Sequence, residues 1–232
     1  PDLLIWPSLT RSADIVAHRF THLREKHVVL FLYVQMQVAF EFAQAIVERA
    51  EGIARPFRRG VRIERQGPEI LPAWHRLYTQ MAERKRIAAE TLEYFEALFA
   101  AARKREPRIR LYAAYRNGRL VAGSIFAFHA PSSRTTYLFS ASSAEGRKRT
   151  AAYAVLWKAM MDAKADGCRW FDFFGIPPND DPSHPMHGLF RFKTRFGGRI
   201  RHLRGCWDYP FDEERYFSLA LPASGRDAYH TR

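Results

Sequence analysis

Apolar and polar residues alternate along the middle of the chain in the pattern of a β-hairpin. The side chains at 109, 111, 113 and 115 are apolar or aromatic, and Asn117-Gly118 follows them as the pair that a type I′ turn prefers. Residues 120–128 then return as a second apolar run. We therefore predict two antiparallel strands joined by a tight turn, which is the clearest hairpin signal in the sequence.

Three further segments repeat their apolar residues at the spacing of an amphipathic helix. The first ends in three basic residues at 84–86, where positive charge suits the helix dipole. The second follows Thr91, a helix-capping residue type, and the third occupies 150–165 before Gly167, which suits a helix end. The side chains expected to face the core are Ile70, Leu71, Trp74, Leu77, Tyr78 and Met81 in the first helix, Leu92, Phe95, Leu98 and Phe99 in the second, and Tyr153, Leu156, Trp157, Met160 and Met161 in the third.

Residues 168–174 form a short aromatic run that predicts a buried strand, and Gly175 marks the point where the chain turns. Weaker strand signals occur at 61–63 and 137–140. The predicted helix at 150–165 connects the strand at 137–140 to the strand at 168–174, so we expect these two strands to be parallel. The sequence therefore predicts a mixed sheet.

The order of these elements is typical of acyltransferases of the GNAT type. We predict an α/β (α+β) fold, with a mixed central sheet flanked by helices, over residues 57–232. Residues 1–56 form a separate N-terminal region, in which helical patterns at 13–25 and 39–54 surround an apolar run at 28–42. That run is too short and too polar to span a bilayer, which takes about 20 apolar residues, and we interpret it as a buried helix or strand.

Composition limits the class of partner. The chain has 232 residues, of which 47% are hydrophobic, and a formal net charge of +13, so it is not of the disordered class and is expected to bind an anionic partner. RNA, an anionic membrane surface and a phosphorylated substrate all fit that charge. Cys168 and Cys206 are the only cysteines and have no zinc-site spacing, which favours a reducing, cytoplasmic setting.

A GNAT enzyme that uses acyl-CoA needs a glycine-containing loop whose amides hold a pyrophosphate at a helix start. The corresponding residues here, 147–152, read Arg-Lys-Arg-Thr-Ala-Ala, with Thr150 in place of a glycine. This substitution weakens the acyl-CoA hypothesis, and a solvated basic turn before a helix is the alternative.

Six segments carry a resemblance to a known family. They are RGVRIE at 59–64, LYTQMAERKRI at 77–87, LEYFEAL at 92–98, LVAGSIFAF at 120–128, AKADGCRWFDFFGI at 163–176 and HGLFRFKTRFGG at 187–198. With these segments the chain resembles the Fem family of aminoacyl-tRNA-dependent peptidyltransferases, which build peptidoglycan interpeptide bridges. The last two segments are the most specific, and the resemblance covers roughly three quarters of the chain.

The resemblance implies a GNAT-like fold and transfer of an amino acid, such as glycine, from aminoacyl-tRNA to the stem peptide of a peptidoglycan precursor. The precursor would be lipid II or a UDP-linked muramyl peptide, reached from the cytoplasm or the cytoplasmic face of the membrane. No metal or redox cofactor is implied. Fem proteins carry two GNAT-like domains, and we expect only the second to be complete here. Because the chain starts at Pro1 rather than methionine, we interpret it as a fragment or a processed chain.

The resemblance also implies roles for individual residues. Phe192 and Lys193 fall on the family's most specific motif and are the two candidate catalytic residues. Lys193 is expected to stabilise the negative charge that develops on the reacting ester. The alternative for Lys193 is a surface lysine on an amphipathic helix. Four further residues are expected to bind substrate, and they are Arg84, Tyr94, Tyr137 and Arg191. The alternatives are a helix-end charge for Arg84 and core packing for the two tyrosines.

Three polar residues near the strand at 168–174 have less specific patterns. Asp172 could orient or deprotonate the acceptor amine, but we favour a structural role in which it binds loop amides. His184 and His187 have the HxxH spacing of some metal sites but lack a third ligand, so we predict no metal there.

Two rival functions stay open at this point. One is an acyl-CoA-dependent GNAT-like N-acyltransferase. The other is a non-catalytic module that uses its positive charge to bind RNA or an anionic surface.

Overall fold

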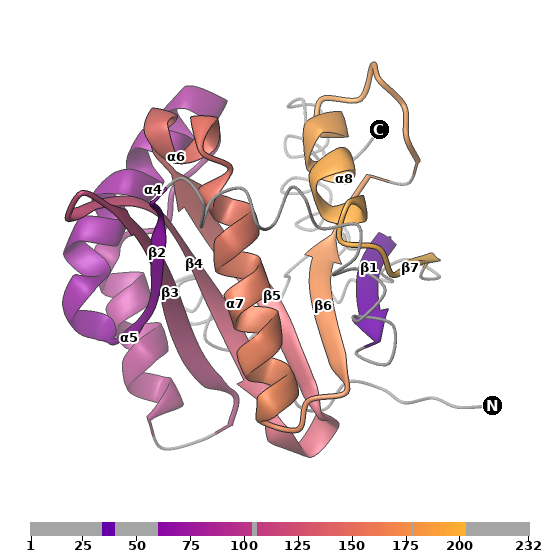
Figure 1. Ribbon diagram of the computed structural model, residues 1–232, viewed down its shortest axis with the longest axis horizontal. Helices are drawn as coiled ribbons and strands as arrows, with labels where there is room; N and C mark the ends of the chain where they lie inside the picture. The colour runs from indigo at the N-terminus through magenta and orange to yellow at the C-terminus, as the bar shows by residue number, and fades with distance from the viewer. Residues whose placement is uncertain (1–33, 40–59, 104–105, 178, 203–232) are drawn as a thin grey trace, which may run out of the picture.

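The computed structural model describes residues 34–39, 60–103, 106–177 and 179–202 (Figure 1). Most of the N-terminal region, including the helical pattern at 13–25, and Cys206 lie outside these residues. The apolar run at 28–42 contributes strand β1 (Val34–Ala39), so a strand, one of the two interpretations, is confirmed there. No helix in the described part of the chain is long and apolar enough to cross a bilayer.

The described strands form a single seven-stranded sheet in the order β2-β3-β4-β5-β6-β1-β7 (Figure 1). Their bounds are β2 Arg62–Gln66, β3 Arg108–Arg116, β4 Arg119–His129, β5 Arg134–Ser142, β6 Trp170–Gly175 and β7 Arg199–His202. All neighbours are antiparallel except β5 and β6, which are parallel as the sequence predicts. The predicted mixed α/β architecture is therefore confirmed.

Local signals in the sequence place the turns and helix ends. Asn117 and Gly118 both have positive φ, at 48° and 73°, which is the conformation of a type I′ turn between β3 and β4. The Thr91 hydroxyl accepts a hydrogen bond from the Tyr94 amide (3.3 Å) and caps the helix that follows. Gly167 has φ +80°, as expected for a residue just past a helix end.

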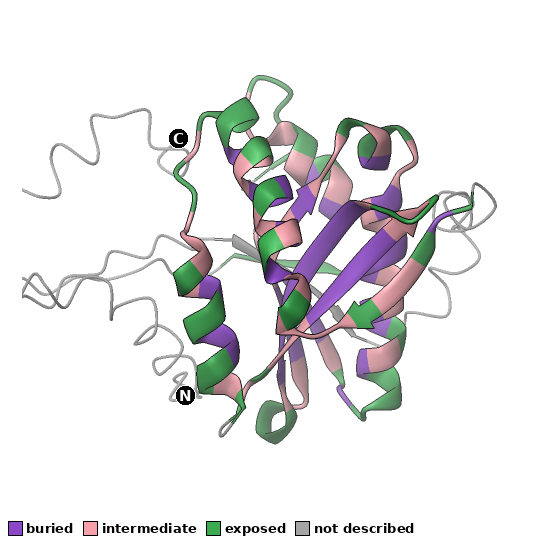
Figure 2. Cartoon of the chain, turned by 90° about the vertical axis from the view of Figure 1, so that its left-hand side faces the viewer, coloured by how far each residue is buried: buried purple, intermediate pink, exposed green. Residues whose placement is uncertain are grey.

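Helices cover both faces of the sheet, and their bounds are α4 Leu71–Lys85, α5 Leu92–Ala102, α6 Ala144–Lys148, α7 Ala151–Ala165 and α8 His187–Thr194. Helices α7 and α8 pack over one set of buried side chains, which we call the first core. Helices α4 and α5 pack over the other set, which we call the second core. Figure 2 shows the buried residues gathered on the central strands and on the helix sides that face them. The second core contains Leu71, Trp74, Leu77, Tyr78, Phe95, Leu98, Phe99, Leu111 and Ile125, and the first contains Tyr112, Phe126, Tyr137, Val155, Met160, Phe171, Phe173 and Phe196, among others.

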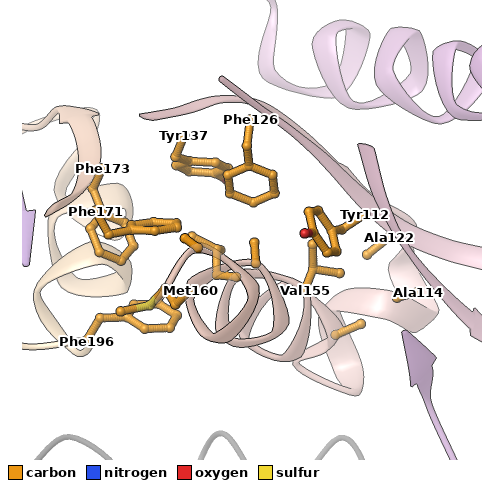
Figure 3. Packing of buried hydrophobic residues seen from close by; sticks show 14 of the residues in the cluster. Tyr112, Ala114, Ala122, Phe126, Tyr137, Val155, Met160, Phe171, Phe173 and Phe196 are labelled. Carbon is orange, nitrogen blue, oxygen red and sulfur yellow. The ribbon is translucent and has the colours of Figure 1, made fainter. Parts of the chain in front are cut away.

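The predicted buried face of α7 was partly wrong. Met161 is 44% exposed, and Tyr153 and Trp157 are only partly buried. Leu156 and Met160 are fully buried, as predicted. The other fully buried residues of α7 are Val155 and four alanines, namely Ala151, Ala154, Ala159 and Ala163. Alanines allow α7 to lie close to the sheet, and Val155 and Met160 extend from the helix into the first core (Figure 3).

Strands β5 and β6 pair only at their first residues. The ladder runs from Arg134 opposite Trp170 to Thr136 opposite Asp172 and ends there. Just beyond this point both strands have a bulge. Strand β5 contains one extra residue relative to β4, and β6 contains one extra residue relative to β1. In β5 the extra residue lies between Tyr137 and Phe139, and in β6 it lies between Asp172 and Gly175. We call this separation of β5 and β6 the fork; bulges of this kind bend a strand and redirect its side chains.

Candidate functional site

Lys193 is buried at the fork. Helix α8 places it there, since Phe190 and Phe196 on either side of it in the sequence anchor the segment in the first core. Lys193 is only 5% exposed. Its Nζ donates hydrogen bonds to the carbonyl oxygens of Phe173 (2.6 Å) and Gly175 (2.8 Å). The alternative of a surface lysine is therefore wrong.

The surroundings of Lys193 lower the pKa of its side chain. Burial lowers the pKa of the Lys193 ammonium to about 7, and the negative charge of Asp172 opposes that change. An ammonium has three N–H donors, and the two carbonyls use two of them. Within the described residues, a third N–H is thus left for a ligand, in a site shielded from water, where a hydrogen bond to a developing negative charge is strongest.

Asp172 is fully buried next to this lysine. Its Oδ1 accepts a hydrogen bond from the Phe174 amide (2.8 Å), and the Arg134 guanidinium lies 3.4 Å from Oδ2. The predicted structural role, in which Asp172 binds amides at the strand end, is confirmed. Phe174 has φ +64°, a left-handed conformation that is unusual for a residue with a side chain.

Tyr137 is the predicted substrate-binding residue that the structure places beside Lys193. The Lys193 Nζ lies 5.5 Å from the centre of the Tyr137 ring, which also packs against Phe126 and Phe173 (Figure 3). Burial raises the pKa of the Tyr137 hydroxyl to about 12, so this group stays protonated at neutral pH. Tyr137 therefore forms part of the wall of the lysine site.

The two other predicted residues on α8 have different surroundings. Phe192 is partly buried, and its ring lies 4.7 Å from that of Tyr153 and 5.7 Å from that of Phe196, measured between ring centres. Its contacts fix α8 against α7. Arg191 is exposed, so its guanidinium is accessible from solvent within two residues of Lys193.

Tyr94 and Arg84 are not brought to Lys193. Tyr94 packs in the second core against Phe95 and Phe139, where burial raises the pKa of its hydroxyl to about 12. Arg84 is exposed in the last turn of α4, and its pKa is lowered by partial desolvation and by the nearby positive charge of Arg147 on α6. The pKa of Lys85 is lowered by burial and by the same two arginines. We call Arg84, Lys85 and Arg147 the cationic patch.

The polar residues of the loop before α8 form hydrogen bonds with one another and with the start of the helix. His187 Nε2 lies 2.7 Å from Asp180 Oδ1, and the Met186 amide donates to His184 Nδ1 (3.0 Å). Asp181 accepts hydrogen bonds from the amide and hydroxyl of Ser183, which lower the pKa of its carboxyl. Over the residues that the structure describes, no three His, Cys, Asp or Glu side chains come together as metal ligands would.

A cavity of about 360 Å³ lies elsewhere, between β2, the end of α5 and the start of β3. It is lined by Gln66, Phe99, Arg103 and Ile109 among others, and by none of the six predicted site residues. We place the candidate site at Lys193 because a buried amine with a strongly lowered pKa is a more specific sign of chemistry than a concave surface.

The sequence did not single out Phe174 or the link between Asp172 and Lys193. Nothing in the letters Asp-Phe-Phe-Gly at 172–175 shows that the second phenylalanine is left-handed. An aspartate three residues before a turning glycine was the available signal, because Asp side chains commonly accept hydrogen bonds from the amide two residues on.

Comparisons with known proteins place the chain in a family. The model of the FemAB family matches residues 101–221. The lipid II:glycine glycyltransferase of Staphylococcus haemolyticus is 28% identical over 106 residues, which are 46% of this chain and 25% of that protein. The chain therefore matches about a quarter of the length of this curated relative.

Two solved structures show the same fold. FemX has a TM-score of 0.69 at 16% identity, covering 82% of this chain and 64% of FemX. L-PGS from Bacillus licheniformis has a TM-score of 0.54 at 14% identity, covering 94% of this chain and 72% of that one. The fold is thus GNAT-like, as the sequence predicts. Since the family model matches more than half of the residues, including all of α8, the chain belongs to the FemAB family.

Proposed function

We propose that this protein transfers an amino acid from aminoacyl-tRNA to an amino group of a peptidoglycan precursor. Membership of the FemAB family and the similarity to a lipid II:glycine glycyltransferase support a transferase of this class. The net charge of +13 suits a tRNA donor and a pyrophosphate-bearing acceptor, because both are polyanions. The acceptor would be the stem peptide of lipid II or of its soluble nucleotide-linked analogue.

The buried lysine at the fork is the observation that carries this proposal. The neutral acceptor amine attacks the ester carbonyl carbon of the aminoacyl-tRNA, forming a C–N bond and placing negative charge on the carbonyl oxygen. The remaining N–H of the Lys193 ammonium donates to that oxygen and stabilises it. Collapse of the intermediate breaks the ester C–O bond, and the released ribose oxygen takes up the proton that the amine loses.

Other residues take supporting roles in this proposal. Tyr137 forms one wall beside Lys193, Phe192 holds α8 in place, and exposed Arg191 offers a guanidinium to an acceptor carboxylate or phosphate. Arg84 acts with the rest of the cationic patch on the phosphates of a polyanion. Tyr94 receives a packing role, because its contacts lie in the second core.

The test is a transfer assay with the purified full-length protein, several charged tRNAs, and lipid II or its nucleotide-linked analogue. We expect transfer of a labelled amino acid that ribonuclease abolishes. No transfer with any charged tRNA, from protein shown to be folded, would contradict the proposal. The same protein titrated with acetyl-CoA should show no saturable thermal stabilisation, and clear stabilisation would favour an acyl-CoA enzyme instead.

A non-catalytic binding module makes a different prediction. In such a module Lys193→Ala weakens RNA binding and its salt dependence but has no reaction to slow. In a transferase the same substitution lowers the rate of the bound complex much more than it lowers affinity. Single-turnover transfer measured beside tRNA binding therefore separates the two.

A further inference from the structure

The two carbonyls that bind Lys193 cannot come from a regular strand. The Phe173 and Gly175 oxygens lie 2.6 and 2.8 Å from one Nζ atom, so their separation cannot exceed the sum of those distances, about 5.4 Å. Carbonyls two residues apart on an extended strand point the same way but stand about 6.6 Å apart. The backbone between them must therefore be shortened for Lys193 to reach both.

Phe174 provides that shortening. It lies between the two carbonyls with φ +64°. At the same position β6 contains one residue more than its neighbour β1. Gln37 pairs with Asp172 and Gln35 with Gly175, so a step of two residues in β1 matches a step of three in β6. A left-handed residue at an extra position of an antiparallel pair is a known form of β-bulge, and glycine usually occupies it. Phenylalanine holds this conformation only where its surroundings impose it.

Asp172 is the group that imposes it. Its fully buried Oδ1 accepts a hydrogen bond from the Phe174 amide (2.8 Å), which fixes the peptide that carries the Phe173 carbonyl. We propose that Asp172 is a positioning residue for Lys193, whose carboxylate holds the bulge at Phe174 and so directs the Phe173 and Gly175 carbonyls onto the Lys193 amine. Only the catalytic consequence of this arrangement rests on the proposed transferase function.

Among the described residues, two side chains of β5 lie near this amine and its carboxylate neighbour. Arg134, from β5, lies 3.4 Å from Asp172 Oδ2, and the Tyr137 ring, also from β5, lies 5.5 Å from Lys193 Nζ. Asp172 can therefore act on Lys193 both through its charge and through the bulge. Substitutions that separate these two routes give the test.

The first measurement follows the Lys193 side chain by NMR in the full chain, with lysine labelled at Cε and the signal assigned by Lys193→Met. In Asp172→Asn the amide oxygen still accepts the Phe174 hydrogen bond but the charge is gone. We expect the Lys193 signal to keep its position while its titration midpoint falls. In Asp172→Ala the bulge is released and the amine loses both carbonyls as well as the charge, so we expect the signal to shift and the midpoint to fall further than in Asp172→Asn.

Glycine at 174 is the matched rescue, because it adopts the left-handed conformation without help. The double variant Asp172→Ala/Phe174→Gly should regain the wild-type signal position, with the lower midpoint of Asp172→Asn. Phe174→Gly alone should leave the signal unchanged, whereas Phe174→Val, a β-branched residue that avoids this conformation, should shift it as Asp172→Ala does.

Three results would overturn the positioning role. They are a folded Asp172→Ala variant with the wild-type signal, a midpoint that falls equally in Asp172→Ala and Asp172→Asn, and a double variant that does not recover the signal position. If Asp172→Ala does not fold, the double variant decides. Its folding with the wild-type signal supports the proposal, and its failure to fold assigns Asp172 to general stability instead.

Activity provides the second measurement. With charged tRNA and the precursor, Asp172→Ala should lower kcat on the order of 10²-fold with little change in KM, and Phe174→Gly should restore most of that loss. The NMR arm needs no substrate. A wild-type protein that transfers nothing would therefore contradict the proposed function and leave the positioning of Lys193 to be decided by the NMR result alone.

Discussion

The two cores both contain aromatic rings but differ in the polar groups that are buried near them. The second core is a cluster of rings centred on Phe95, which contacts Trp74, Tyr78 and Phe139. Around the first core and the fork lie the buried polar residues that the structure describes, namely Ser124, Thr135, Thr136, Asp172 and Lys193. Burying a charged group costs stability unless it is paired, so its retention points to function. The second core stabilises the fold, and the fork is where we expect chemistry.

The largest expected effect on stability tests the second core. Phe95→Ala removes a fully buried ring from the centre of that cluster and should lower the free energy of unfolding by about 3–5 kcal/mol. Urea unfolding measures the loss. The rate per folded molecule should stay at the wild-type level, and Phe95→Leu, which fills most of the volume, should lose much less. A folded Phe95→Ala variant that transfers slowly would break the division between the two faces.

Lys193 should destabilise the protein near neutral pH. Its pKa is about 7 when folded and near 10.4 when unfolded, so between these values the unfolded chain binds one more proton and stability rises with pH. Compared with Lys193→Met, the wild type should therefore gain roughly 3–5 kcal/mol of unfolding free energy between pH 7 and pH 10. Urea unfolding of both proteins across this range measures the difference. A difference that stays constant with pH would show that Lys193 is not buried as an amine.

A smaller effect is expected at the start of α5. Thr91→Ala removes the hydroxyl that accepts from the Tyr94 amide and should cost about 1 kcal/mol of stability. Thr91→Ser keeps the acceptor and serves as the control. Because α5 packs only in the second core, the transfer rate should not change, and thermal unfolding beside a transfer assay measures both. Equal loss in both variants would show that the cap contributes nothing.

The smallest effect concerns the cationic patch. Arg84→Ala and Arg147→Ala should each reduce the slope of log affinity for tRNA against log salt by about 0.9, because each would remove one phosphate contact. Arg62→Ala, an exposed arginine already paired with Glu64, is the matched control and should leave the slope unchanged. Slopes that do not differ among the three variants would remove the patch from the binding surface.

Much of the fold could be predicted because its signals are local. The Asn117-Gly118 turn, the Thr91 cap and the parallel pairing of β5 with β6 each follow from a few neighbouring residues and a short connection. The family resemblance predicted that Lys193 stabilises the negative charge that develops on the reacting ester. Its burial could not be read from the sequence, because a lysine on an amphipathic helix is usually exposed.

The bulges account for what the sequence could not show. Tyr137 and Phe139 are two residues apart and would share a face on a regular strand, yet Tyr137 lies in the first core and Phe139 packs against the second. The extra residue between them, Leu138, reverses the alternation. The left-handed conformation of Phe174 in β6 could not be predicted from the sequence for the same reason. Both irregularities depend on how the strands pair, and they occur where β5 and β6 separate around Lys193.

The most direct test of the lysine at the fork is the single-turnover transfer rate of Lys193→Met with bound aminoacyl-tRNA and saturating precursor. Methionine fills similar space and keeps the site apolar, so the fold and the tRNA affinity should be retained. If Lys193 stabilises the developing oxyanion, the rate falls about 10²–10³-fold at or below pH 7, and the ratio of the wild-type rate to the Lys193→Met rate declines as the pH rises through the lysine pKa of about 7, because the acceptor amine titrates alike in both proteins. A Lys193→Met variant that transfers at the wild-type rate would contradict the account.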